Sequence, residues 1–189
     1  MRTITYGGAV SLDGFLAGAD GAIDWLYHSK DAQQVMTDYW KDIDTILWGR
    51  KTYDVSVAMR PAPTKKPAKA KSPKPKQRPA MHNYVFSRTL KTLDDPDMEL
   101  VTSDAVEFVR ALKQNPGKEI CLMGGGELAQ SLLAADLVDE ICLNIHPILL
   151  GTGIPTFRDP GHRVKLQLFE CRQLEGGCVL AGYRVLHAQ

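Results

Sequence analysis

Hydrophobic residues along the chain fall into two alternating patterns, short apolar runs and longer segments with apolar positions at helical spacing. The short runs predict buried strands over residues 4–12, 43–48, 84–86, 100–102, 119–123 and 139–148. The helical spacing predicts helices over 31–41, a short segment after 49, 104–113 and 127–135. Because strands and helices alternate, we predict an α/β fold with a mostly parallel central sheet flanked by helices. Two last runs, 164–174 and 179–186, predict a C-terminal antiparallel hairpin, and the segment 151–157 before them is predicted to be a loop.

The strand predicted over 119–123 ends at the triple glycine 124–126, and a helix follows directly. Free backbone N–H groups at a helix start, together with the positive end of the helix dipole, favour an anion such as a phosphate. Glycine lets a ligand approach the backbone and permits φ > 0. The same glycines would also fit a tight turn, so both interpretations stay open. A Walker motif is absent, because no Lys-Ser or Lys-Thr follows, and a Rossmann fingerprint fits poorly.

Two further strand ends carry groups that suit an anion. The strand over 43–48 runs into Gly49-Arg50-Lys51-Thr52, and the strand over 84–86 runs into Ser87-Arg88-Thr89. A solvated helix start is the alternative at the first of them, although two cations there oppose the helix dipole. Parallel strands place their carboxyl ends at one edge of the sheet, where open α/β sheets bind ligands. The three ends therefore suit a ligand with several phosphates, and the cationic pair suits the extra phosphate that NADPH has and NADH lacks.

A long irregular segment up to about residue 29 follows the first strand and carries Trp25 and Tyr27. Such a segment is typical either of an active-site lid or of a packed surface loop, and both readings stay open. His146 precedes Pro147 and is interpreted as a structural or rim histidine rather than a general base. The helix over 31–41 presents a stripe that we predict to face the core, made of Val35, Met36, Tyr39 and Trp40.

The composition, 189 residues of which 44% are hydrophobic, predicts one domain with a substantial core. No apolar run approaches the roughly 20 residues that span a bilayer, and the start lacks a signal-peptide core, so we expect no membrane partner and a cytoplasmic protein. The net charge of +1 hides a basic tract between 60 and 79, which holds eight of the 23 Lys and Arg residues. We predict residues 60–80 to be a disordered Pro/Lys-rich inserted loop.

Two classes of ligand are disfavoured by the remaining pattern. No aromatic residue lies among the lysines of the 60–80 tract, and the rest of the chain is acidic, which argues against nucleic acid. The four cysteines show no CxxC pairing, so we predict reduced thiols and no metal site.

Taken together, the motifs resemble the dihydrofolate reductase superfamily, and within it the branch of the riboflavin-biosynthesis reductase, the C-terminal domain of the bacterial bifunctional deaminase-reductase. The matching pieces are spread in the family's order over nearly the whole chain: Ser11-Leu12-Asp13-Gly14, Gly49-Arg50-Lys51-Thr52-Tyr53, Val85-Phe86-Ser87-Arg88-Thr89, Met123-Gly124-Gly125-Gly126-Glu127-Leu128 and Pro147-Ile148-Leu149-Leu150-Gly151-Thr152-Gly153. The resemblance implies a dihydrofolate reductase-like fold, a single reductase domain over 1–189, NADPH as cofactor and a homodimer.

The resemblance also implies roles for individual residues. Ala9 would hold the nicotinamide through its backbone, and Ser87 and Arg88 would bind the adenosine 2′-phosphate. The phosphates and pyrophosphate would be held by Gly49, Arg50, Lys51, Thr52, Gly124, Gly125, Gly126, Glu127 and Leu128. Trp25 resembles the lid tryptophan beside the substrate. The carboxylate that supports protonation is assigned to Asp31, with Asp13 and Asp24 as rivals.

The activity implied is hydride transfer from NADPH to a C=N or C=O group of a small heterocyclic or ribose-like substrate. The nearest named activity is that of 5-amino-6-(5-phosphoribosylamino)uracil reductase in riboflavin biosynthesis. A dihydrofolate or pterin reductase is one alternative. A nucleotide-binding or scaffold protein without turnover is the other.

Overall fold

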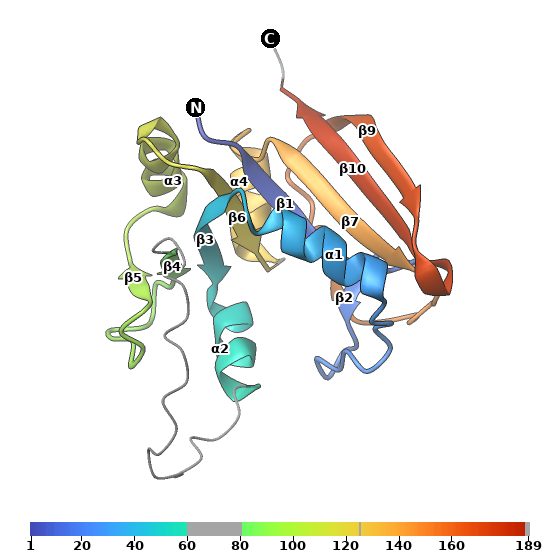
Figure 1. Cartoon of the computed structure of the whole chain (residues 1–189). Coiled ribbons are helices and arrows are strands. Elements are labelled where there is room, and N and C mark those ends of the chain that lie inside the picture. Colours follow the sequence, from blue (N-terminus) through green and yellow to red (C-terminus); the bar gives the residue numbers. More distant parts are fainter. Residues whose placement is uncertain (60–80, 125, 188–189) are drawn as a thin grey trace, which may run out of the picture.

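The computed structural model describes residues 1–59, 81–124 and 126–187 of the chain. It forms an eight-stranded sheet in the order β5-β4-β3-β6-β1-β7-β10-β9, beside a small sheet of β2 and β8 (Figure 1). The elements are β1 (Ile4–Ser11), β2 (Phe15–Ala17), α1 (Lys30–Tyr39), β3 (Ile43–Gly49), α2 (Arg50–Ala58), β4 (His82–Phe86), β5 (Glu99–Val101), α3 (Ala105–Gln114), β6 (Glu119–Met123), α4 (Glu127–Ala134), β7 (Glu140–His146), β8 (Ile154–Pro155), β9 (Lys165–Gln173), η1 (Glu175–Gly177) and β10 (Val179–Leu186).

All pairings from β5 to β7 are parallel, and β10 pairs antiparallel with both β7 and β9. The predicted α/β class, the mostly parallel sheet and the C-terminal hairpin are therefore confirmed. The first strand lies in the middle of the sheet, where it pairs with β6 on one side and β7 on the other.

Helices cover both faces of the sheet (Figure 1). The larger core lies under α3 and α4, where Val109 and Leu132 pack with Tyr6 and Leu122 of the central strands, all of them fully buried. On the other face α1 packs with Ala32 and Val35 against the start of β10, and Tyr39 with the following Trp40 packs against β3 and β6. Burial of the apolar faces on both sides of the sheet provides most of the favourable folding free energy.

Two local predictions are wrong. The segment 151–157 is not entirely a loop, because β8 pairs with β2 there and closes a small second sheet. Met36 does not face the core, since 48% of its surface is exposed and no residue of α1 is fully buried. Helical spacing identified the helix, but the face that packs is defined by Ala32, Val35 and Tyr39, which leaves Met36 at its edge, in solvent.

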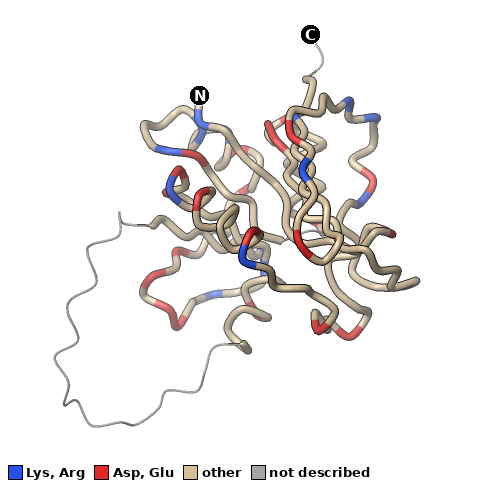
Figure 2. The backbone as a smooth tube through the Cα atoms, turned by 45° about the vertical axis from the view of Figure 1, so that its right-hand side comes forward, with Lys and Arg blue, Asp and Glu red and all other residues tan. Residues whose placement is uncertain are grey.

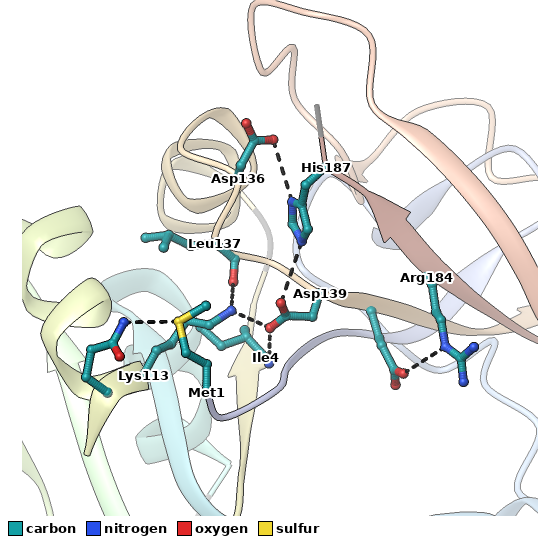
Figure 3. Close-up of polar contacts among 10 residues, drawn as sticks. Met1, Ile4, Lys113, Asp136, Leu137, Asp139, Arg184 and His187 are labelled. Carbon is teal, nitrogen blue, oxygen red and sulfur yellow. Dashed lines mark hydrogen bonds and ion pairs between the residues drawn. The ribbon is translucent and has the colours of Figure 1, made fainter. Parts of the chain in front are cut away.

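A buried ion pair joins the amino-terminal edge of the sheet to α3 (Figure 3). Lys113 is 3% exposed, and its ammonium donates to the carbonyl of Leu137 at 2.9 Å and forms an ion pair with Asp139. The same carboxylate accepts the backbone N–H of Ile4 at 2.7 Å and lies 3.6 Å from the imidazole of His187. Asp139 therefore connects the start of β1 with α3 and with the end of β10.

Acidic and basic residues are interspersed along the described chain (Figure 2). Within the ranges described, no helix is both long and apolar enough to cross a bilayer. The basic tract 60–80, predicted to be disordered, lies outside the described residues.

Candidate functional site

A groove of about 630 Å³ runs along the carboxyl ends of β3, β4, β5 and β6. It brings together three segments that are far apart in the sequence, 49–52, 87–88 and 126–128. The residues that line it are Gly49, Arg50, Lys51, Thr52, Phe86, Ser87, Arg88, Thr89, Val101, Thr102, Ser103, Asp104, Ala105, Gly126, Glu127, Leu128, Ser131 and Arg158. The strand ends therefore converge as the parallel topology predicts, while Gly125 lies outside the described residues.

Two helices begin at this groove without a side-chain cap among the described residues. The N-cap residues of α2 and α4 are Gly49 and Gly126, and neither provides a side-chain cap. By contrast, the side chain of Asp104 caps α3 by accepting the N–H of Glu107 at 3.0 Å. The first N–H groups of α2 and α4 are thus available to an anion, and both helix dipoles add positive potential there.

Cations surround these helix starts. Arg50 is held by a carboxylate of its own helix, since its Nε lies 2.7 Å from Asp54. Arg88 is 88% exposed at its side chain and lies 3.4 Å from Glu127, a loose contact that a ligand phosphate would replace at small cost. Arg158 approaches from the loop after β8 and completes the cationic lining with Lys51. The sequence analysis missed Arg158 and Thr102 as lining residues, and only Thr102 has a signal, its position at the end of the strand predicted over 100–102.

Glycine 124 fixes how closely β6 and α2 approach each other. Its φ is +101°, and a β-carbon built there would overlap Oγ1 of Thr52 and lie 2.8 Å from that residue's Cβ. On the neighbouring strand, a β-carbon on Gly49 would meet the side chain of Leu128 at 3.9 Å. Leu128 belongs to the core on this face of the sheet and also lines the groove, so it anchors the start of α4 beside the site.

Ser87 is a buried hydroxyl at the end of β4 that organises its own turn. Its Oγ accepts the N–H groups of Leu90 at 3.1 Å and Thr89 at 3.3 Å. The hydroxyl hydrogen is left to donate to an acceptor, either Oγ1 of Thr89 at 3.4 Å or a ligand oxygen in the groove.

Ala9 lies outside the groove, on β1, opposite Asn144 of β7. In the sheet order, β6 separates β1 from β3, so Ala9 sits farther along the same carboxyl edge. From β4 to β1 the edge spans three strand spacings, roughly 14 Å. A ligand with one end at Ser87 and the other at Ala9 would therefore lie extended across the ends of β3 and β6.

The two predicted carboxylates both accept several hydrogen bonds. Asp13 accepts from the hydroxyl of Ser11 at 2.6 Å and from the N–H of Gly151 at 2.7 Å, and these bonds lower its pKa. Asp31 accepts from the hydroxyl of Ser29 and from the N–H of Glu175 at 2.8 Å, which lowers its pKa in the same way. Both are ionised at neutral pH, so either could donate a proton only after this set of hydrogen bonds changed.

Trp25, the predicted lid residue, lies at the other end of the edge from the groove. Its ring meets the ring of His146 edge to face, with centroids 5.4 Å apart and an interplanar angle of 88°. The neighbouring Tyr27 packs on Gly176 so closely that a β-carbon there would overlap its ring. The irregular segment after β1 thus carries Trp25 over the carboxyl ends of β1 and β7.

A protein-family model, the RibD C-terminal domain, matches residues 2–180. This chain belongs to that family. It is 36% identical to the protein YyaP of Bacillus subtilis over 188 residues, which cover 97% of this chain and 95% of YyaP. It is 30% identical over 162 residues to the riboflavin biosynthesis protein RibD of Mycobacterium tuberculosis, covering 84% of this chain and 46% of that protein. This RibD-family chain thus corresponds to about half of the RibD polypeptide.

Solved structures show the same fold. The RibD-family chain matches a protein from Shewanella sp. PV-4 with a TM-score of 0.79 and 22% identity, over 99% of this chain and 100% of the other. It matches a Thermotoga maritima deaminase/5-amino-6-(5-phosphoribosylamino)uracil reductase with a TM-score of 0.69 and 17% identity. The match covers 98% of this chain and 57% of the other. Dihydrofolate reductase from Enterococcus faecalis, complexed with NADP(H), matches with a TM-score of 0.65 and 14% identity. The match covers 97% of this chain and 96% of the reductase. The fold is therefore of the dihydrofolate reductase type.

In this RibD-family domain, replacing Asp31 by asparagine should lower the free energy of unfolding in a pH-dependent way. A carboxyl group whose pKa is lowered by folding stabilises the native state above its unfolded pKa of about 3.9, and this contribution is lost as the pH falls through the native value. We expect Asp31→Asn to be less stable than the natural protein at pH 7 and the difference to shrink at about pH 3. Urea denaturation at both pH values measures it, with Asp24→Asn, an exposed neighbour, as control. A difference that stayed constant between the two pH values would contradict the anchoring role.

Proposed function

We propose that this chain is an NADPH-dependent reductase that transfers a hydride to a C=N or C=O group of a small heterocyclic or ribose-like substrate. The nearest activity is that of 5-amino-6-(5-phosphoribosylamino)uracil reductase. The observation that carries this proposal is the groove at the carboxyl edge. Two helix starts without side-chain caps and the cationic residues Arg50, Lys51 and Arg88 line a single groove there.

The relatives support the same class of reaction. The Mycobacterium tuberculosis relative is named a riboflavin biosynthesis protein, and the Thermotoga maritima structure is named as a reductase of the phosphoribosylamino-uracil. The Enterococcus faecalis dihydrofolate reductase with this fold was solved with NADP(H). A nicotinamide cofactor with an extra phosphate also fits the charges found in the groove.

Different residues along the carboxyl edge of the sheet would bind different parts of the cofactor. The free amides of α2 and α4 would bind the pyrophosphate, and Ser87 and Arg88 would bind the 2′-phosphate. Ala9 would position the nicotinamide ring through its backbone at the far end. NADPH, when bound, supplies the hydride, while the protein supplies orientation and excludes water. Trp25 would contribute to that exclusion, because its segment covers the ends of β1 and β7.

The direct test is an NADPH oxidation assay with each of two substrates in turn. The loss of nicotinamide absorbance monitors the reaction. Oxidation with 5-amino-6-(5-phosphoribosylamino)uracil is the expected result. Turnover of dihydrofolate alone would indicate a pterin reductase instead. NADPH binding without oxidation in the presence of either substrate would favour a nucleotide-binding protein without turnover and would contradict the proposal.

The proposed place of the 2′-phosphate gives a specific prediction for Arg88. We expect Arg88→Ala to weaken NADPH binding by about tenfold or more, the value of one charge-assisted hydrogen bond, and to leave NADH binding unchanged. Titration of both nucleotides by calorimetry measures the two effects. Arg110→Ala is a matched control, because Arg110 is also an exposed arginine paired with a glutamate but lies on α3 outside the groove. Equal losses for NADPH and NADH would place the 2′-phosphate elsewhere.

A further inference from the structure

A second polar cluster lies at the carboxyl ends of β1 and β7, beside Ala9 and away from the groove. At its centre is His146, which is 2% exposed. Its Nδ1 accepts the backbone N–H of Tyr27 at 3.3 Å and lies 3.5 Å from the thiol sulfur of Cys178. Its Nε2 lies 3.3 Å from the side-chain nitrogen Nδ2 of Asn144, and Trp25 meets its ring edge to face.

These contacts fix which nitrogen of His146 carries the hydrogen. A backbone N–H can only donate, so Nδ1 must be the unprotonated acceptor and Nε2 must carry the hydrogen of the neutral ring. Burial, with a further contribution from His28, lowers the pKa of His146 and favours this neutral form. Because Nε2–H needs an acceptor, the amide of Asn144 must turn its oxygen toward His146. The alternative, an NH2 group facing Nε2, would require an imidazole with no hydrogen at all.

The orientation of the Asn144 amide has a consequence for its other end. With Nδ2 next to His146, it is Oδ1 of Asn144 that is buried and has no hydrogen-bond partner among the described residues. Turning the amide so that Oδ1 accepts from His146 puts the NH2 group, a donor, in that position. The indole Nε1–H of Trp25 is also a donor, is equally buried and also lacks a partner within the described ranges. Unpaired buried donors are rare in native proteins and indicate a missing acceptor.

We propose that Trp25 and Asn144 form a pair of donors that binds a hydrogen-bond acceptor on the substrate, a carbonyl oxygen or an unprotonated ring nitrogen, with His146 as the positioning residue that fixes the amide. The inference rests on the proposed function for the identity of the ligand as substrate. It agrees with the location of the cluster, since Asn144 pairs with Ala9, where the nicotinamide would lie. Substrates with a heterocyclic carbonyl, such as uracils and pterins, meet this requirement.

The first test reads the donors directly. In protein labelled with nitrogen-15 and saturated with NADP⁺, which cannot deliver a hydride, we add 5-amino-6-(5-phosphoribosylamino)uracil or dihydrofolate. The indole proton of Trp25, assigned with Trp25→Phe, and the amide protons of Asn144 should move downfield on adding the ligand. The indole of Trp48 is an internal control, because it already donates to Asn83 at 3.1 Å and should not move.

The second test uses steady-state kinetics. Asn144→Asp replaces the donor by an acceptor, and we expect KM for the substrate to rise by about tenfold or more, with a smaller change in kcat. Asn83→Asp is the matched control, because Asn83 is a strand asparagine on β4 that accepts from the indole of Trp48 on β3, and this change should leave KM unchanged. An unchanged KM in Asn144→Asp, together with unmoved Trp25 and Asn144 signals, would overturn the inference.

The positioning role of His146 has its own readout. Glutamine can place an N–H donor near the position of Nε2, so His146→Gln should leave KM unchanged and retain the ligand-induced shift of the Asn144 signal. His146→Leu fills similar space without a donor, so KM should rise and the shift should disappear, provided that its thermal unfolding is still cooperative. Equal behaviour of the two variants would overturn the tautomer argument.

The tests separate this inference from the proposed function. Oxidation of NADPH without any response of Trp25 and Asn144 would refute the donor pair and leave the reductase intact. Absence of oxidation with both substrates would refute the reductase, and the ligand-induced shifts would then decide alone whether the donor pair binds these compounds.

Discussion

Replacing Gly124 by alanine is expected to destabilise the fold by about 3 kcal/mol and to weaken NADPH binding. Two causes act together. The φ of +101° is strained for any residue with a side chain, and the new methyl group would overlap Oγ1 of Thr52 at the start of α2. Relief of that overlap moves α2 away from β6 and widens the groove where the pyrophosphate would bind. Urea denaturation followed by circular dichroism, with an NADPH titration, measures both effects.

Gly161→Ala separates backbone strain from the steric overlap. Its φ of +86° is similar, but a β-carbon there meets nothing within 4 Å. We expect it to cost only about 1 kcal/mol, the strain component. Adding Thr52→Gly to Gly124→Ala should recover part of the loss, since it removes the overlapping atoms. If Gly124→Ala proves no worse than Gly161→Ala, the close approach of β6 and α2 is wrong.

Replacing Asp139 by alanine is expected to cost about 3–5 kcal/mol of unfolding free energy. The substitution leaves the ammonium of Lys113 buried without a counter-ion, and it also leaves the N–H of Ile4 without its acceptor. The cost of the unpaired charge dominates, because an isolated ammonium in the interior loses its hydration without compensation. Urea denaturation of the single variant measures it.

Two comparisons make this prediction specific to burial. Glu140→Ala breaks the neighbouring ion pair with Arg184 (Figure 3), in which the two side chains are 3.9 Å apart. The Arg184 side chain is 63% exposed, so the substitution should cost less than about 1 kcal/mol. The double variant Lys113→Met, Asp139→Leu removes both charges and should recover most of the stability lost by Asp139→Ala. If Asp139→Ala costs no more than Glu140→Ala, the pair does not act as a buried one.

Much of the fold and of the groove could be predicted from the sequence, for reasons that are local. Apolar runs bounded by glycine mark β3 and β6, because a buried parallel strand is apolar on both faces. Once these strands are parallel, Arg50, Ser87 and Gly126 must reach one edge, and the structure brings them to one groove. The roles of these residues toward NADPH stay predictions, as does the assignment of Asp13, Asp31 and Trp25 to the reaction.

Other features depend on contacts between distant segments and leave no local trace. The pairing of β2 with β8 joins segments of three and two residues, too short to show a period. Arg158 reaches the groove from an irregular loop with no pattern of its own. His146, interpreted as structural, does pack in the interior, but its contacts with Tyr27, Cys178 and Asn144 arise only when β7 meets β10 and the segment after β1. The homodimer and the cytoplasmic location also stay predictions.

The central place of β1 constrains how the molecule can be made. This strand precedes all the others in the chain, yet its partners begin at Glu119 and Glu140, so Ile4 meets Ile120 and Thr5 meets Glu140 only after most of the polypeptide exists. On the ribosome, β1 therefore stays unpaired until β6 and β7 have been synthesised. The long sequence separation between these strands also slows folding, because closing a large loop costs conformational entropy. Chaperones that shield apolar segments would have their greatest value for this chain during that interval.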